Sequence, residues 1–236
     1  MDSVEERKDG IAVTFTGEQA PEKPIVYDRI LLSVGRKPNT ENIGLEHTGI
    51  EVTDKGFVKV DEQRRTTEPS IFAIGDINGP PLLAHKASHE GKVAAEAAAG
   101  IKTAFEPRVI PAVEYTEPEI AWAGLTEREA EKQGLAVKVS KFPWTASGRA
   151  VTLGTQEGLT KLIADPESER LLGAAIVGTH AGELISEAAL AIEMGAKMSD
   201  LSLTIHPHPT LSETLMEAAD AFYGQSTHVY RPKKKQ

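Results

Sequence analysis

The second half of this 236-residue chain alternates strand-like runs with capped, amphipathic runs, and this alternation restricts the possible folds more than any other feature. A capping box of Thr126 and Glu129 begins a helix that ends before Gly134. Apolar residues at three- and four-residue spacing indicate two longer helices, at 184–195 and 211–222. Three runs are strand candidates: 135–142, 160–164 and 172–177, the last two joined by a turn at Asp165-Pro166. The pattern therefore predicts strands mixed with capped helices in this half of the chain.

The first half has shorter apolar runs that read as strands of a mixed α/β region. Residues 11–16 alternate as a strand does, and 25–27 begin another extended run. Residues 30–34 are almost continuously apolar and predict a buried strand that ends at Gly35. Residues 70–74 are apolar on both faces, which is typical of a strand inside a parallel sheet.

A helix is expected at residues 83–99, with small side chains along one face. These side chains recur at three- and four-residue spacing: Ala84, Ala87, Ser88, Gly91, Ala94, Ala95 and Ala98. Such a face allows close packing against another backbone. His85 and His89 lie one turn apart on this helix, but two histidines leave a structural zinc two ligands short, so a metal site is not predicted.

The segment 206–213, His-Pro-His-Pro-Thr-Leu-Ser-Glu, allows two interpretations. It places His208 directly before a proline and five residues ahead of Glu213. An imidazole oriented by a carboxylate is a general base whose charge changes near neutral pH. Alternatively, Thr210 caps a helix and Glu213 completes a capping box, which leaves His208 without a role.

Five motifs in the same order resemble those of a known family. Besides 206–213, they are Val34-Gly35-Arg36-Lys37-Pro38-Asn39, Ile71-Phe72-Ala73-Ile74-Gly75-Asp76, Tyr115-Thr116-Glu117-Pro118-Glu119 and Phe142-Pro143-Trp144-Thr145-Ala146-Ser147-Gly148-Arg149-Ala150. The chain is similar to the flavin-dependent pyridine nucleotide-disulfide oxidoreductases, which include glutathione reductase. Leu211 favours the dihydrolipoamide dehydrogenase branch over the glutathione reductase branch.

The resemblance covers only the C-terminal half of such enzymes. Family members begin with a flavin-binding domain that carries G-x-G-x-x-G and a pair of redox-active cysteines, and this chain has neither. Thiol–disulfide exchange needs thiolates, so we expect this truncated polypeptide to be inactive alone. Two hypotheses follow: part of an NAD-dependent dihydrolipoamide dehydrogenase, or a non-catalytic dimerisation module.

The resemblance also implies site residues. Gly35 corresponds to a glycine against the nicotinamide cofactor, although a simple turn glycine is the safer interpretation because the sequence lacks the cofactor's own fingerprint loop. Asp76 would accept a hydrogen bond from the ribityl chain of FAD, and Ala84 would lie at the helix end that faces the flavin ring. His208 and Glu213 would form an acid/base pair that serves the active site of a partner subunit. The first histidine of the motif, His206, is expected to be structural.

The resemblance divides the chain into three parts. Residues 1–36 would be a remnant of the nicotinamide-binding domain, and 37–105 a central region with a flavin-contacting strand and helix. Residues 106–236 would be the dimerisation domain, an α+β unit with an antiparallel sheet flanked by helices. The implied cofactors are FAD and NAD, and the implied partners are a second copy of the chain and the lipoyl-bearing acyltransferase of a 2-oxo acid dehydrogenase complex. In the family, residues 70–74 would lie inside the sheet of the flavin-binding domain. Without that sheet, we expect this segment to be rearranged, to be exchanged between protomers, or to be the least stable part of the fold.

Charge and hydropathy exclude some partners. The net charge is −9, even though the last six residues include Arg231 and three lysines, so nucleic acid is not an expected partner. No apolar run has the length of a membrane span, and no signal peptide is recognised, which favours a cytoplasmic protein. The basic end is expected to be solvated and flexible.

Overall fold

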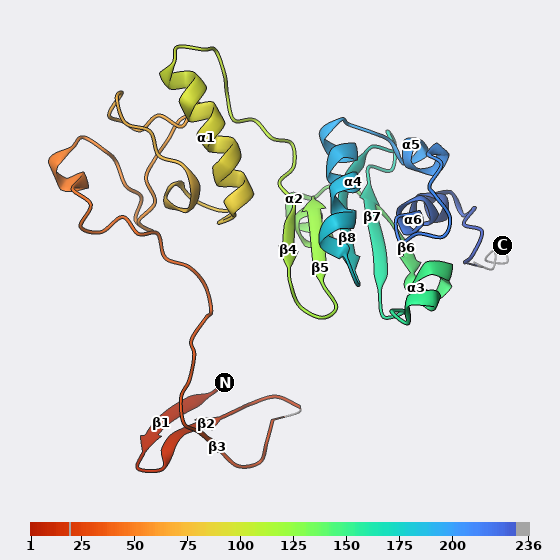
Figure 1. Ribbon diagram of the computed structural model, residues 1–236, viewed down its shortest axis with the longest axis horizontal. Coiled ribbons are helices and arrows are strands. Elements are labelled where there is room, and N and C mark those ends of the chain that lie inside the picture. Colours follow the sequence, from red (N-terminus) through yellow and green to blue (C-terminus); the bar gives the residue numbers. More distant parts are fainter. Residues whose placement is uncertain (19, 230–236) are drawn as a thin grey trace.

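The computed structural model describes residues 1–18 and 20–229 and consists of three parts joined by extended segments (Figure 1). A small sheet lies at the N-terminus, a helix with irregular loops forms the middle, and a layered α+β unit forms the C-terminal part. The predicted flexible basic end, with Arg231, lies outside the described residues. No described helix is long and apolar enough to cross a membrane.

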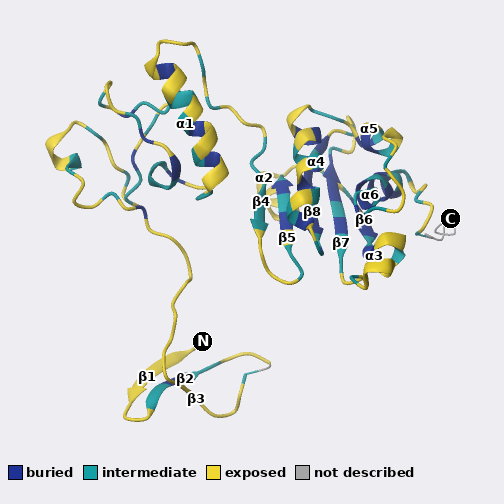
Figure 2. Ribbon diagram, in the orientation of Figure 1, coloured by how far each residue is buried: buried dark blue, intermediate teal, exposed yellow. Residues whose placement is uncertain are grey.

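The N-terminal sheet has three antiparallel strands in the order β1-β2-β3. They are β1 (Ser3–Arg7), β2 (Gly10–Thr14) and β3 (Ile25–Tyr27), which confirms the strands predicted at 11–16 and 25–27. Only Ala12 and Val13 are buried in this sheet, and Figure 2 shows most of the rest as exposed.

The buried strand predicted at 30–34 is wrong. The segment lies in the extended connection between the first two parts, and Leu31 and Val34 are 90% and 87% exposed. A strand needs a neighbour to satisfy its backbone N–H and C=O groups. Within the described part of the chain, nothing pairs with this segment.

The strand predicted at 70–74 is also wrong. The structure contains one isolated bridge there, between Arg65 and Phe72, and buries Ala73, whereas Ile71 and Ile74 remain partly exposed. The described residues supply no sheet for this segment to enter. Around it are the short helices η1 (Leu45–His47) and η2 (Gly75–Asn78).

The helix predicted at 83–99 is confirmed as α1 (Ala84–Ala98), but it buries a different face from the one expected. Its buried residues are Lys86, Glu90 and Ala97. Of the small side chains, Ala84, Ser88, Ala95 and Ala98 are exposed. Two positions of the small face are closely approached: a Cβ added at Gly75 would lie 3.1 Å from Ala87, and one added at Gly91 would lie 3.3 Å from the Ile74 side chain.

The C-terminal part is the predicted antiparallel sheet flanked by helices. Its strand order is β4-β5-β8-β7-β6. The strands are β4 (Ala112–Glu114), β5 (Ile120–Gly124), β6 (Lys138–Pro143), β7 (Leu159–Ala164) and β8 (Leu171–Val177). The helices are α2 (Glu127–Gln133), η3 (Trp144–Ala146), α3 (Gly148–Leu153), α4 (Ala181–Glu193), α5 (Met198–Leu203) and α6 (Glu213–Tyr223).

Local signals explain where several of these elements begin and end. The Thr126–Glu129 capping box is present, and Gly134 and Gly224 end α2 and α6 in the left-handed conformation. Helix α4 packs on β5 and β8, and α6 packs on β6 and β7, so one continuous apolar core fills the space between sheet and helices. The sequence patterns missed β4, β5, α3 and α5, which are all short.

Trp144 occupies the centre of this core and is fully buried. Two glycines make room for its ring. A Cβ at Gly158 would lie 2.4 Å from the indole, and one at Gly178 would lie 2.3 Å from it. The sheet therefore accepts the large side chain only because two neighbouring positions have none.

Candidate functional site

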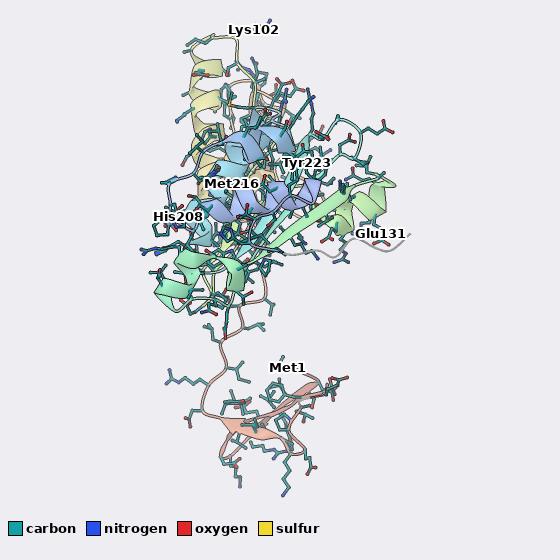
Figure 3. The ribbon with its side chains drawn as sticks, turned by 90° about the vertical axis from the view of Figure 1, so that its right-hand side faces the viewer. Met1, Lys102, Glu131, His208, Met216 and Tyr223 are labelled. Atoms are coloured by element: carbon teal, nitrogen blue, oxygen red, sulfur yellow. The ribbon has the colours of Figure 1, made fainter. Side chains whose placement is uncertain are left out.

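His208 and Glu213 form a hydrogen-bonded pair at the surface of the C-terminal part (Figure 3). The His208 Nδ1 atom lies 2.9 Å from the Glu213 Oε1 atom. The imidazole is 72% exposed and the carboxylate 20% exposed. The pair comes from the loop before α6 and from the first residue of that helix.

The protonation of the pair follows from its contacts. Burial works to raise the pKa of the Glu213 carboxyl, but hydrogen bonds from the Thr210 amide and the His208 ring outweigh burial, and the pKa lies below its ordinary value. The carboxylate is therefore ionised at neutral pH and can only accept hydrogen bonds. His208 Nδ1 must then carry a proton, and Nε2 is the basic nitrogen of the neutral ring. Such a ring can accept a proton from a thiol or hydroxyl that reaches the surface.

The capping interpretation is only half correct. The Glu213 Oε2 atom accepts the Thr210 backbone N–H at 2.8 Å, as in a capping box. However, the Thr210 hydroxyl donates to the Pro207 carbonyl, and the helix begins at Glu213 with Ser212 as its N-cap. The carboxylate therefore both holds its own loop and orients His208, so the two interpretations describe one arrangement.

His206 anchors the same loop from inside. Its side chain is 4% exposed, its Nε2 lies 2.7 Å from Glu187 Oε1 on α4, and its Nδ1 lies 2.9 Å from the Thr204 carbonyl oxygen. Sequence reasoning missed Glu187, because this partner lies on another helix and no local motif marks it. The only available signal was its place on the polar side of the helix predicted at 184–195.

A hollow of about 470 Å³ lies beside the His208 loop. The loop residues Pro209, Thr210, Leu211 and Ser212 form one wall. Arg149, at the start of α3, and His180, before α4, also line the hollow. The loop backbone can therefore be approached from solvent.

Asp76 and Ala84 both lie in the middle part of the structure, on η2 and α1, two elements that contact one another. Asp76 belongs to η2 and is partly exposed, and its Oδ2 atom accepts a hydrogen bond from Arg36 Nη1 at 3.1 Å. Ala84 is the exposed first residue of α1, and no side chain caps that helix end. Gly35, next to Arg36, is exposed, with no described side chain or backbone within 4 Å of the position its Cβ would take.

A buried ionic network, which sequence reasoning missed, holds Asp76 and Ala84 in place. Glu90 on α1 is completely buried. Its carboxylate accepts hydrogen bonds from the Gly75 amide at 2.7 Å, from Asn78 at 3.2 Å and from Arg64 at 3.1 Å. Lys86 lies 3.1 Å from the same carboxylate. The Lys86–Glu90 spacing of four residues was visible in the sequence, but it is equally typical of a solvated helix face.

Lys86 completes this network on the other side of the turn. Its ammonium donates to the Gly75 and Gly79 carbonyl oxygens and to the Asn78 side chain, at 2.9 to 3.2 Å. Lys86 and Glu90 thus each have several polar partners, as a buried ion pair requires, whereas the Arg64 guanidinium hydrogen-bonds only to Glu90 among the described residues. Lys86 and Glu90 therefore hold the turn that presents Asp76 through the backbone amide and carbonyl of Gly75 and through the side-chain amide of Asn78.

The two histidines of α1 do not form a metal site with neighbours. His85 Nε2 lies 2.7 Å from the Pro111 carbonyl oxygen, which links α1 to the segment before β4. The described residues contain no group of three His, Cys, Asp or Glu side chains placed to hold a metal ion.

The predicted residues therefore lie in two places: Asp76 and Ala84 are in the middle part, on η2 and α1, and His208 and Glu213 are on the C-terminal part.

Two family models match the chain. Residues 2–91 match the model described as pyridine nucleotide-disulphide oxidoreductase, and residues 110–219 match the dimerisation domain of the same family. The dihydrolipoyl dehydrogenase of Vibrio cholerae is 51% identical over 99% of the chain, which spans 49% of that protein. The dihydrolipoyl dehydrogenase of Thermus scotoductus is 55% identical over 95% of the chain, again across 49% of the relative. The chain thus spans about half the length of the curated relatives it matches.

Solved structures agree with these matches. LpdA from Mycobacterium tuberculosis is 27% identical, with a TM-score of 0.81, over 93% of this chain and 47% of that one. The HOCl-induced flavoprotein disulfide reductase RclA from Escherichia coli is 25% identical, with a TM-score of 0.81, over 92% of this chain and 49% of that one.

Proposed function

Because the chain belongs to the pyridine nucleotide-disulphide oxidoreductase family, we propose that it is the C-terminal part of a dihydrolipoyl dehydrogenase that supplies the acid/base pair. The observation that carries the proposal is the His208–Glu213 hydrogen bond at an accessible surface. The proposed reaction oxidises a protein-bound dihydrolipoamide to lipoamide, with NAD as the final electron acceptor. The chain has no cysteine, so the redox-active sulfurs must come from elsewhere in the complete enzyme.

In this proposal, His208 Nε2 accepts a proton from a dihydrolipoamide thiol, which gives a thiolate and an imidazolium. Glu213 keeps the other ring nitrogen protonated and stabilises the cation that forms. The imidazolium then lies beside the thiolate and stabilises its negative charge. The solvent-exposed position of His208 suits a substrate presented by another protein.

The middle part would hold the edge of FAD. Asp76 offers a partly exposed carboxylate as a hydrogen-bond acceptor, and the uncapped end of α1 offers free backbone amides. The Asp76 carboxylate could accept hydrogen bonds from the hydroxyl groups of the ribityl chain, and the free amides of α1 would suit the electron-rich flavin ring. FAD, when bound, would supply two-electron redox chemistry, and Gly35 would lie against NAD. With so few contacts here, we expect little flavin retention by the chain alone.

The proposal includes a homodimer and three parts of the chain. A second copy would bring His208 to the Asp76 edge of the first, through the 106–236 dimerisation domain. The 1–36 and 37–105 segments would belong to the nicotinamide-binding and flavin-contacting regions. The lipoyl-bearing acyltransferase of a 2-oxo acid dehydrogenase complex would be the physiological partner, in the cytoplasm. The alternatives are a non-catalytic dimerisation module and a glutathione-reductase-like relative.

A complementation experiment tests the proposal. The N-terminal half of the Vibrio cholerae dihydrolipoyl dehydrogenase, which would bring the sulfurs, is refolded with this chain and FAD, and NAD reduction by dihydrolipoamide is measured. We expect activity, and a loss of about 10²- to 10⁴-fold in a His208→Gln variant, because a general base is removed. His47→Gln is the matched control, since His47 is also an exposed histidine beside a glutamate, Glu46, and it lies in the middle part of the chain.

The outcomes separate the alternatives. Equal activity of the His208→Gln and His47→Gln assemblies would refute the acid/base role. A flavin-loaded assembly that reduces glutathione disulfide but not lipoamide would favour the glutathione branch. A colourless dimer of this chain, inert in every mixture, would leave the dimerisation module.

A further inference from the structure

A buried column of hydrogen bonds connects the sheet to the His208 loop. The Trp144 indole N–H donates to the Thr160 hydroxyl at 3.0 Å, and the Thr160 hydroxyl donates to the Thr214 hydroxyl at 2.8 Å. The Thr214 hydroxyl donates to the Leu211 carbonyl at 2.7 Å. Trp144, Thr160 and Thr214 are each no more than 1% exposed.

The direction of this column is fixed by its ends. An indole nitrogen can only donate, and a carbonyl oxygen can only accept. The two hydroxyls between them are satisfied by a single proton order, from Trp144 toward Leu211. Each bond therefore supports the next, and losing one link reorients the others.

The column ends where the loop needs support. The Leu211 carbonyl also accepts the Thr214 backbone N–H at 3.1 Å, so Thr214 donates two hydrogen bonds to the same carbonyl oxygen. Leu211 directly follows Thr210, whose amide holds Glu213, and Thr214 directly follows Glu213. A shift at Leu211 or Thr214 would thus be transmitted to both ends of the Thr210–Glu213 contact.

We propose that Thr160 is a positioning residue for the His208–Glu213 pair and acts through the column Trp144–Thr160–Thr214–Leu211. This inference rests on the proposed function for its consequence in catalysis. Its structural claim, that a hydroxyl on β7 sets the geometry of Glu213, stands without any activity.

Thr160→Val tests the claim in the chain as it is. Valine has the same shape but neither accepts from Trp144 nor donates to Thr214. We expect the Glu213 carboxyl, followed by ¹³C NMR against pH, to titrate higher than in the parent chain, because its contacts with Thr210 and His208 loosen. The carboxyl of Glu129, held by Thr126 on α2, is the internal reference and should not move.

Three further variants make the result specific. Thr160→Ser keeps the hydroxyl and should restore the parent titration. Thr152→Val is the matched control, because Thr152 also donates to a carbonyl three residues back, that of Arg149, at the surface. If Thr160→Val fails to fold, Thr214→Val must show the same upward movement of the Glu213 titration.

Activity gives a second readout. In the complemented enzyme, Thr160→Val should lower kcat by about 10- to 100-fold with little change in KM, since the pair is present but misplaced. An unchanged Glu213 titration in folded Thr160→Val or Thr214→Val would overturn the proposal, whatever the activity. Failure of complementation would overturn the proposed function instead and would leave the NMR result intact.

Discussion

The buried network around Glu90 should decide the stability of the middle part of the chain. That part has no sheet, and its fully buried apolar residues are few: Val58, Ala73 and Ala97. Its order must therefore come largely from the contacts of Glu90 with Arg64, Lys86, Gly75 and Asn78. Glu90→Ala removes the carboxylate and leaves the cations behind.

The magnitude follows from burial. The side chain of Lys86 is only 5% exposed and that of Arg64 14% exposed, so Lys86 would become an unpaired buried charge. Removal of one partner of a buried ion pair costs about 3 to 5 kcal/mol. Lys86 keeps three neutral acceptors, at Gly75, Asn78 and Gly79, so we expect the lower end, about 3 kcal/mol.

Amide hydrogen exchange measures this loss in one part of the chain at a time. A decrease of about 3 kcal/mol in opening free energy speeds exchange by roughly a hundredfold, since about 1.4 kcal/mol is a factor of ten. We expect this acceleration at the amides of α1 and at Gly75, whereas α4 amides in the C-terminal part stay unchanged. Glu96→Ala, an exposed glutamate on the same helix, is the control.

A double variant separates charge from packing. Glu90→Leu with Lys86→Met replaces the buried pair by apolar side chains, and Arg64 can reach solvent, so much of the protection of α1 should return. Equal exchange in Glu90→Ala and Glu96→Ala would refute the reasoning. It would mean that the middle part is held by something other than its ion network.

Three further predictions concern the C-terminal part. Ser140 is buried and its hydroxyl has no hydrogen-bond partner among the described residues, so Ser140→Ala should raise the free energy of unfolding by about 1 kcal/mol in urea titrations. Gly178→Ala should cost more than about 3 kcal/mol, because φ is +148° and the new Cβ would meet the Trp144 ring; Gly154→Ala, in a left-handed turn with open space, should cost only about 1 kcal/mol. Glu213 has a lowered pKa when folded, so its contribution to stability is complete above the ordinary value of 4.5 and is lost as the pH falls through the folded value. Glu213→Gln should therefore make the acid-side loss of stability shallower in thermal melts, and an unchanged slope would contradict the assigned contacts.

The elements predicted correctly are those whose signals are local. Thr126, Glu129 and Gly134 specify α2 by themselves, and the apolar spacing of α4 and α6 needs no information from elsewhere. Residues 30–34 and 70–74 failed for the opposite reason. Their apolar composition indicates burial in a sheet, but the neighbours that would form the sheet are not among the described residues.

The candidate site divides in the same way. The His208–Glu213 pair was predictable because both residues lie in one short motif, and the structure places them 2.9 Å apart. The support around the pair was not predictable, since Glu187 lies on α4 and Thr160 on β7. Their contacts exist only after the sheet and helices have packed. The catalytic and cofactor roles of these residues remain predictions for the complementation experiment.

The strand order of the C-terminal sheet also bears on how this part folds. Strands β7 and β8 pair across the turn at Asp165, and β6 pairs with β7 across residues 144–158, a shorter separation than that between β5 and β8, so these three can meet early. Strand β5 instead pairs with β8, and α2, β6, α3 and β7 all lie between them in the chain. Closing that long loop lowers the conformational entropy of the chain before the β5–β8 contacts can offset the loss. The three-stranded β6-β7-β8 sheet is therefore expected to form first, and docking of the β4–β5 hairpin onto β8 is expected to limit the rate of folding.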